Sequence, residues 1–344
     1  MRSVSFKSNG LVQKDHECRR PVAFLFNGQG SQYYQMARSL YQQHEAFRQT
    51  MQYLDRHVKK HIGESMLSVL YDDLRGKGDP FTAVRFTHPA IFCLQYALAD
   101  LLQQAGWVPD YLVGSSLGEF VAATISGAIE PEVALEAVLE QSIIIERSCP
   151  PGGMLAILSS QEFYSEHPEI FGECELVGIN YADHFVIAGD VSVLERAQAM
   201  LREHGVSCLS LPVNYGFHSR LIDQAARSYL DYLRRLPVKQ PAISVISCQT
   251  GAELNSYSQD HFWRATREPI KFLATLQWLE DQVGEGRGFI YIDFGPGGTL
   301  ANFIKRGLAV QSASSFHSIV TPFDQEVVKL REVEQALLRN LTRG

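Results

Sequence analysis

A serine between two glycines is the first candidate for chemistry in this sequence. Gly114, Ser116 and Gly118 form a G-x-S-x-G pattern that follows the apolar run 111–113 and precedes a helical stretch. In such a strand–turn–helix context the glycines allow a sharp turn, and the serine hydroxyl projects at the helix N-terminus. The N–H of Leu117 would then face an oxyanion that develops on an attacked carbonyl. The pattern predicts acyl chemistry through a covalent serine intermediate, although a serine in an ordinary turn fits the same residues.

A serine nucleophile needs a base, and two of the eleven histidines are candidates. His218 lies in the string Asn-Tyr-Gly-Phe-His-Ser at 214–219, and His317 lies near the C-terminus. An enzyme of the α/β-hydrolase type places an acidic residue and then a late histidine after its serine. No acidic residue can be singled out for that role, so both histidines stay open at this point.

The elements around these residues predict an α/β fold in two parts. The apolar run 22–26 is followed by Asn27-Gly28-Gln29-Gly30, which predicts a buried strand that ends in a glycine turn. His88-Pro89 is expected to open a helix over 90–104. Residues 151–213 read as strand–helix–strand–strand–helix–strand, which is the ferredoxin-like pattern. We therefore predict a flexible tail at 1–20, an α/β-hydrolase-like large subdomain with a mostly parallel sheet at 21–150 and 214–320, an inserted ferredoxin-like small subdomain at 151–213, and a C-terminal helical segment at 321–344.

Composition excludes several classes of function. The net charge is −7, which argues against nucleic acid or an anionic membrane as the main partner. No apolar run approaches the roughly 18 residues that span a bilayer, and the N-terminus lacks the apolar core of a secretory signal. The six cysteines are scattered without C-x-x-C spacing, so we expect a cytoplasmic location and no metal site.

Strings along most of the chain resemble the malonyl-CoA:acyl carrier protein transacylase family, which includes polyketide synthase acyltransferases. The resemblance rests on residues 26–32, Thr87-His88-Pro89-Ala90, residues 113–119, Gly127-Ala128, Gly152-Gly153-Met154, Asn180, Phe217-His218-Ser219, Arg267-Glu268-Pro269 and Phe294-Gly295-Pro296-Gly297. It implies a two-step Ser/His mechanism through an acyl-serine ester. It also implies acyl carrier protein domains of a polyketide synthase as partners. No cofactor is implied beyond the phosphopantetheine or coenzyme A that carries the acyl group.

The resemblance also assigns roles to individual residues. Ser116 becomes the nucleophile, and His218 rather than His317 becomes the base. The backbone N–H groups of Gln29 and Leu117 would form the oxyanion hole. A backbone carbonyl would orient the histidine, and counting four residues back from Pro269 places it at Ala265. The residues expected to set acyl specificity are Gln141, Ser115, Phe217, Tyr215 and His88.

Three residues depart from the family pattern. Gln141 stands where malonyl-selecting relatives carry an arginine that binds the malonyl carboxylate, Ser115 where most carry histidine, and Asn27 where many carry proline. A buried carboxylate without its cation is disfavoured by about 2–5 kcal/mol, so the site should no longer prefer malonyl. With glutamine at this position, the chain resembles a subgroup of trans-acting acyl hydrolases, which remove acyl groups from carrier proteins.

The leading prediction is therefore an editing acyl hydrolase of a polyketide synthase. An acyltransferase that loads a neutral acyl unit is the main alternative, and a non-catalytic binding homologue or an unrelated α/β-hydrolase are the others. Because carrier proteins are acidic, docking would need a local basic patch. The candidates for such a patch are Arg19, Arg20, Arg38, Arg220, Arg264 and Lys271.

Overall fold

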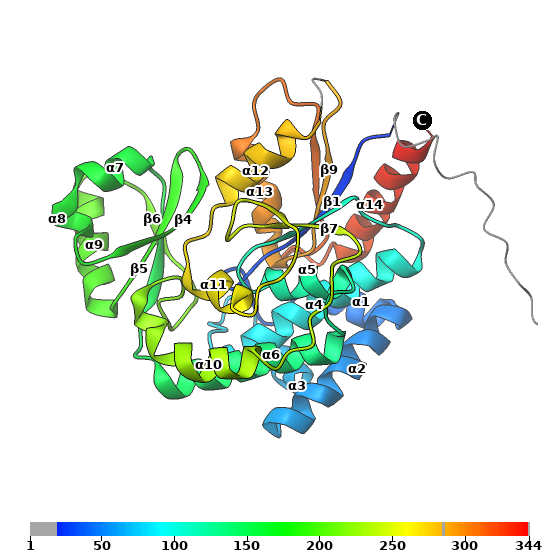
Figure 1. Cartoon of the computed structure of the whole chain (residues 1–344), viewed down its shortest axis with the longest axis horizontal. Coiled ribbons are helices and arrows are strands. Elements are labelled where there is room, and N and C mark those ends of the chain that lie inside the picture. Colours follow the sequence, from blue (N-terminus) through cyan, green and yellow to red (C-terminus); the bar gives the residue numbers. More distant parts are fainter. Residues whose placement is uncertain (1–18, 284–285, 343–344) are drawn as a thin grey trace, which may run out of the picture.

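The structure is a computed structural model that describes residues 19–283 and 286–342. It contains two β-sheets, and Figure 1 shows the part built on the smaller sheet in green at one side of the larger body. Most of the predicted N-terminal tail, residues 1–18, lies outside the described residues. Arg19 and Arg20, which the prediction assigns to the tail, are held to the large body. Arg19 pairs with Asp110, and the Arg20 N–H donates to Asn340 Oδ1 at 3.0 Å.

The larger sheet has six strands. Their spatial order is β10 (Ser315–Ser318), β9 (Ile290–Asp293), β1 (Val22–Phe26), β2 (Tyr111–Gly114), β7 (Ser244–Ser247) and β8 (Ala252–Leu254). Every neighbouring pair is parallel except β7 and β8, which are antiparallel. All five residues of β1 are buried, as in a parallel strand that helices cover on both faces. The predicted mostly parallel sheet is confirmed.

Helices cover both faces of this sheet. They are α1 (Arg38–Gln43), α2 (Glu45–Ile62), α3 (Met66–Leu70), α4 (Val84–Gln104), α5 (Gly118–Ile125), α6 (Pro131–Ser148), α10 (Ala226–Leu233), α11 (His261–Arg267), α12 (Phe272–Asp281), α13 (Thr299–Gly307) and α14 (Glu326–Leu341), with the 3-10 turns η1 (Arg220–Ala225) and η2 (Pro296–Gly298). Successive residues of β1 point to opposite faces. Phe24 and Phe26 therefore pack with α4, α5 and α6, whereas Ala23 and Leu25 pack with α12 and α13.

The small subdomain is a four-stranded sheet with helices on one face. Its chain order is β3 (Gly153–Ile157), α7 (Gln161–Glu166), α8 (Pro168–Phe171), β4 (Glu175–Tyr181), β5 (His184–Gly189), α9 (Val191–Glu203) and β6 (Cys208–Ser210). The strands lie in the order β4-β5-β3-β6, and all pairs are antiparallel. This is the ferredoxin-like arrangement that the sequence predicts.

Strand β3 shows how the two parts meet. Leu155 and Ile157 belong to the core of the small subdomain, under α7, α8 and α9. Met154 and Ala156 point to the other face and join the core of the large subdomain. The bare face of the small sheet therefore closes against the large subdomain, and β3 presents side chains to the junction.

One predicted helix boundary is wrong. The helix expected to open at His88-Pro89 begins at Val84, and Pro89 lies inside it. Proline lacks the N–H that would reach the carbonyl of Arg85, and for this reason the sequence predicts a helix start at this position. Burial overrides that preference, because every residue from Thr87 to Gln95 is buried. Among the described residues, no helix has the length and apolarity needed to cross a membrane.

Candidate active site

Ser116 lies in a tight turn between β2 and α5. Its backbone has a φ of 55°, a left-handed conformation that non-glycine residues seldom adopt. The flanking glycines are needed for space. A Cβ on Gly114 would lie 2.7 Å from the Glu119 Cα, and one on Gly118 would lie 2.0 Å from the Phe26 carbonyl oxygen. The turn brings the Ser116 hydroxyl to the carboxyl edge of the sheet, at the start of α5.

His218 reaches Ser116 from the segment that returns from the small subdomain. The Ser116 Oγ and the His218 Nε2 are 2.9 Å apart. The other ring nitrogen, Nδ1, lies 2.8 Å from the Glu268 carbonyl oxygen. A carbonyl can only accept, so Nδ1 carries the proton and Nε2 is left to accept the serine proton. The two side chains have the geometry of a nucleophile–base pair for acyl transfer.

The carbonyl that orients His218 is that of Glu268, not that of Ala265. The predicted position, four residues before Pro269, lies inside helix α11. Carbonyls inside a helix are directed along its axis to later N–H groups. Glu268 is the C-cap of α11 and has extended angles, φ −87° and ψ 156°, so its carbonyl is free to turn towards the imidazole. The His218 N–H also donates to the Thr266 carbonyl at 3.0 Å, which fixes the backbone.

Burial sets the protonation state of His218. The side chain is almost fully buried, and this lowers the pKa of the imidazole to about 4. The bond to the Glu268 carbonyl raises the pKa, and the nearby Arg267 charge lowers it further. The imidazole is therefore neutral at physiological pH, which is the form able to accept a proton from Ser116.

The two backbone N–H groups expected to form an oxyanion hole, those of Gln29 and Leu117, belong to segments that meet at Ser116. The loop of Gly28 and Gln29 packs so closely on the elbow that a Cβ on Gly28 would lie 3.0 Å from Ser116 Oγ and 3.3 Å from the Leu117 N. Neither the Gln29 N–H nor the Leu117 N–H donates to another described residue. Both donors are therefore free to bind a substrate oxygen, and the Leu117 N–H has the further advantage of lying at the start of α5, where negative charge is stabilised.

Ser116 opens on a cleft between the two subdomains. Both the large subdomain and the inner face of the small sheet line it, the latter through Met154, Ala156 and Val186. Four of the five predicted acyl-pocket residues line this cleft, namely Gln141, Ser115, Phe217 and His88. Tyr215 does not. It lies in a neighbouring hollow with Pro151 and Asn214, because the chain turns between Tyr215 and Phe217.

The cleft contains no formal charge. None of its lining residues is Lys, Arg, Asp or Glu. Burial lowers the pKa of His88 to about 3, and burial also lowers the pKa of His184, so these imidazoles are neutral as well. At position 141 the amide nitrogen donates to Thr266 Oγ1 at 2.8 Å, and a longer contact of 3.5 Å reaches the Tyr229 hydroxyl.

Several of these contacts escape sequence reasoning. Thr266 and Glu268 act through the end of α11, a helix that the sequence pattern does not reveal, although the string Arg267-Glu268-Pro269 lies beside them. Tyr229 is fully buried on α10 and gives no separate signal. His317 lies on β10, and it lines surface hollows away from the cleft.

Metal-binding capacity lies outside the cleft. Within the described part of the chain, one group of side chains has ligand atoms close enough to hold an ion, formed by His167, Glu169 and His204 on the small subdomain. Its atoms lie within 4.8 Å of one another, and two of its residues are exposed. The Ser116–His218 pair needs no metal for the chemistry that its geometry supports.

Comparison with known proteins places this geometry in context. The family model described as an acyl transferase domain matches residues 23–338. The chain is 42% identical over 314 residues to the polyketide biosynthesis acyltransferase homolog PksD of Bacillus subtilis (strain 168), covering 91% of this chain and 96% of that protein. It is 41% identical over 319 residues to the homolog BaeD of Bacillus velezensis, covering 93% and 97%.

Solved structures give the same result for the fold. The acyl-carrier-protein S-malonyltransferase of Burkholderia pseudomallei 1710b superposes with a TM-score of 0.75 at 27% identity, covering 92% of this chain and 99% of that one. The comparison confirms the predicted two-part α/β architecture.

Proposed function

This chain belongs to the acyl transferase domain family, and from that premise we propose that it is a trans-acting acyl hydrolase of a polyketide synthase. Its substrates are acyl thioesters on the phosphopantetheine arm of acyl carrier proteins, and it uses no further cofactor. The relatives PksD and BaeD are named for polyketide biosynthesis, which supports this pathway. The uncharged cleft with Gln141 supports the choice of neutral acyl groups, and it is the observation that carries the proposal.

The first half of the reaction transfers the acyl group to the enzyme. Ser116 Oγ attacks the thioester carbon, and its proton passes to His218 Nε2 over the 2.9 Å contact. The N–H groups of Gln29 and Leu117 stabilise the oxyanion, and loss of one such donor costs roughly 2.7–4 kcal/mol of transition-state stabilisation. The carbon–sulfur bond then breaks, and the thiol leaves with the proton from His218.

The second half releases the acid. Ser116 is partly exposed at the cleft floor, so water can reach the ester. Neutral His218 accepts a proton from that water as its oxygen attacks the ester carbon. The bond to Ser116 Oγ breaks, the proton returns to the serine, and the products are a free carboxylic acid and a regenerated enzyme.

A transferase is the second candidate, because the relatives are named acyltransferase homologs and a solved relative is named an S-malonyltransferase. In that case a second carrier thiol, rather than water, would attack the acyl-serine. Gln141 is compatible with both outcomes, since it acts on the acyl group and not on the attacking group.

Mass spectrometry separates the two candidates. We expect butyryl-loaded carrier protein incubated in ¹⁸O-labelled water to yield labelled butyrate and free-thiol carrier protein. Ser116→Ala should abolish this, whereas Ser165→Ala, a change at an exposed serine on α7, should not. If a second carrier protein of different mass becomes acylated faster than labelled acid appears, the enzyme is a transferase.

A further inference from the structure

The side-chain amide of Gln141 has only one orientation that its neighbours allow. The Thr266 hydroxyl donates its single hydrogen to the Phe262 carbonyl at 2.8 Å. The Tyr229 hydroxyl donates its own to the Ala137 carbonyl at 3.1 Å. Each hydroxyl has one hydrogen, so towards Gln141 both can only accept. The amide must therefore turn its NH₂ group to them, as the 2.8 Å and 3.5 Å contacts show.

This orientation leaves the amide oxygen facing the cleft. Gln141 Oε1 accepts no hydrogen bond from any described residue. Several fully buried polar atoms of the described residues lack a hydrogen-bond partner, but Gln141 Oε1 is not one of them. Since this oxygen has no partner, it must be accessible to solvent. Gln141 itself is 3% exposed and lines the cleft. The free oxygen is therefore reachable from the space that receives the acyl group.

An acceptor in an apolar cleft discriminates between acyl chains. A plain alkyl chain that covers Oε1 removes it from water and offers no hydrogen in return, which is unfavourable. A carboxylate brings a second acceptor and negative charge towards the same oxygen. A hydroxyl supplies the donor that Oε1 lacks.

We infer that Gln141 Oε1 is a hydrogen-bond acceptor for the substrate, and that the preferred substrates are short acyl thioesters with a hydroxyl group on C2 or C3. This inference rests on the proposed function only in that Ser116 becomes acylated. It concerns which acyl group enters the cleft, so it does not depend on whether water or a thiol later removes it.

The test measures acylation of Ser116, the step that hydrolysis and transfer share. Pantetheine thioesters of butyrate, 2-hydroxybutyrate, 3-hydroxybutyrate and malonate serve as probes, and thiol release with intact-protein mass spectrometry reports acyl-enzyme formation. We expect kcat/KM for the better hydroxybutyryl probe to exceed that for butyryl by roughly tenfold, with malonyl the poorest.

Two variants connect the preference to the amide. Gln141→Met keeps the length of the side chain and removes the acceptor, so the hydroxybutyryl-to-butyryl ratio should fall to about one. Thr266→Val keeps Oε1 but removes the main acceptor that orients the amide, so the ratio should take an intermediate value. Gln161→Met, at an exposed position on α7, is the matched control and should leave the ratio unchanged.

The outcomes are separable. Labelling of Ser116 by a fluorophosphonate checks that each variant is folded with an intact Ser116–His218 pair. A wild-type enzyme without hydroxyacyl preference, or a ratio that Gln141→Met does not move, overturns the inference. If acid release fails while the acylation ratio behaves as expected, only the hydrolase proposal is lost.

Discussion

Ser116 and His218 share an uncommon backbone conformation. Five described non-glycine residues have a positive φ, and these two are among them, at 55° and 63°. The left-handed conformation costs an ordinary residue roughly 1–2 kcal/mol. The surrounding contacts must hold it, and here they are the glycines of the elbow and the bond from the His218 N–H to the Thr266 carbonyl. Two of these five strained positions therefore lie where Ser116 meets His218.

The low pKa of His218 predicts the pH dependence of activity. Protonated His218 cannot accept the Ser116 proton, so kcat/KM should fall as pH drops through the pKa of about 4. We expect a nearly flat profile from about pH 8 to pH 6 with the half-maximum near pH 4, rather than near the ~6.5 of an exposed histidine. The measurement is kcat/KM for an uncharged acyl-pantetheine substrate from about pH 8 down to the predicted half-maximum near pH 4.

Stability must be followed in the same series. Between about pH 6.5 and pH 4, His218 is protonated in the unfolded chain but not in the native state. The free energy of unfolding therefore also falls as pH drops through this interval. Circular dichroism at each pH separates acid unfolding from loss of the base. A half-maximum near pH 6.5 in a folded enzyme would contradict the burial argument.

Gln141→Arg should redirect the acyl specificity. The hydroxyls of Thr266 and Tyr229 already donate elsewhere and can only accept, so a guanidinium finds acceptors at both. The cation would then be available to a malonyl carboxylate and would be left unpaired by a neutral acyl group. We expect the malonyl-to-acetyl ratio of kcat/KM to rise by roughly ten- to hundredfold.

The matched comparison is Gln141→Met, which changes the same position without adding charge. Both variants are assayed with malonyl and acetyl thioesters, and acid release and carrier loading are scored separately. An unchanged malonyl-to-acetyl ratio in folded Gln141→Arg would mean that position 141 does not read the acyl group. The charge argument against malonyl would then be lost.

For individual residues, the sequence predicts which side chains react better than it predicts which groups orient them. Gly114 and Gly118 make the elbow at Ser116 readable, because only a tight turn needs both. The carbonyl that orients His218 cannot be identified from the sequence, because Ala265 and Glu268 are only three residues apart and the exact end of α11 decides which of them faces the imidazole. The orientation of the Gln141 amide depends on where two distant hydroxyls send their hydrogens, and no local pattern carries that information.

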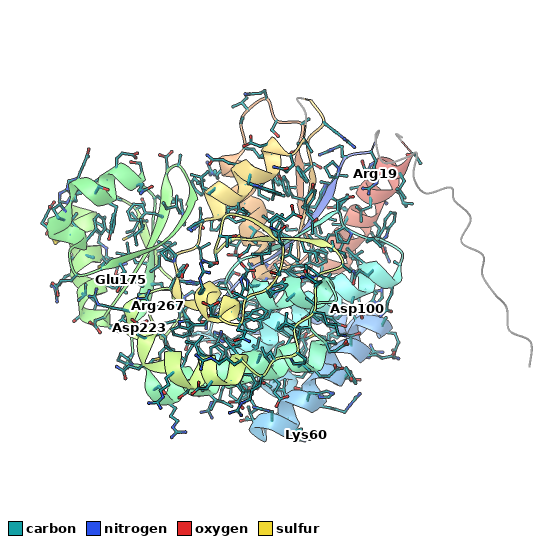
Figure 2. All side chains as sticks on the ribbon, viewed as in Figure 1. Arg19, Lys60, Asp100, Glu175, Asp223 and Arg267 are labelled. Atoms are coloured by element: carbon teal, nitrogen blue, oxygen red, sulfur yellow. The ribbon has the colours of Figure 1, made fainter. Side chains whose placement is uncertain are left out.

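Among elements, α11 connects the base to the small subdomain. Its last residue, Arg267, pairs with Asp223 of η1 at 2.5 Å and approaches Glu175 of β4 at 3.9 Å. Figure 2 shows these three side chains together beside the green subdomain. Glu175 also pairs with Arg220 at 3.2 Å. The cluster therefore joins both subdomains next to Glu268, whose carbonyl orients His218.

Arg267→Gln should weaken this junction and change the base. Removing the charge that lowers the pKa of His218 should raise that pKa, so the acid limb of kcat/KM should move to higher pH. The free energy of unfolding should fall by about 1 kcal/mol, because these ion pairs are partly exposed to solvent and each contributes little. The measurements are the pH profile and urea unfolding.

The control is Arg196→Gln, which removes an exposed pair with Glu173 inside the small subdomain. It tests charge loss without touching the junction, and it should leave the pH profile in place. If both variants shift the acid limb equally, the effect of Arg267 is general and not local to His218.

Periodicity predicts the order of the elements but not all their bounds. The ferredoxin-like run is recognisable because its strands and helices alternate over a short, uninterrupted stretch. The predicted start of helix α4 is too late, because Pro89 resembles a helix start and only its burial inside the fold shows otherwise. Helices α11 and α13 are shorter than three turns and carry cleft residues, so their apolar periodicity is too brief to identify from sequence.

For the whole molecule, the predicted basic patch does not form as a set. Arg19 and Arg20 precede β1, at the opposite end of the sheet from Ser116, and Figure 2 shows Arg19 far from Arg267. Arg38, Arg220 and Arg264 pair with Asp73, Glu175 and Glu268. Of the six candidates, Lys271 is exposed and makes no ion pair with a described residue. These six residues therefore do not form a basic patch that would locally offset the net charge of −7.

This charge pattern predicts the salt dependence of docking to an acidic carrier protein. Two acidic partners repel at long range, and salt screens that repulsion over about 10 Å at 0.1 M. Raising sodium chloride from about 50 to 300 mM should therefore leave KM for acyl carrier protein unchanged or lower it by up to roughly twofold. Uncharged acyl-pantetheine is the matched control, since its KM reports only what salt does to the cleft. A rise in KM of more than about threefold, confined to the carrier-protein substrate, would require a basic docking patch outside the six residues considered.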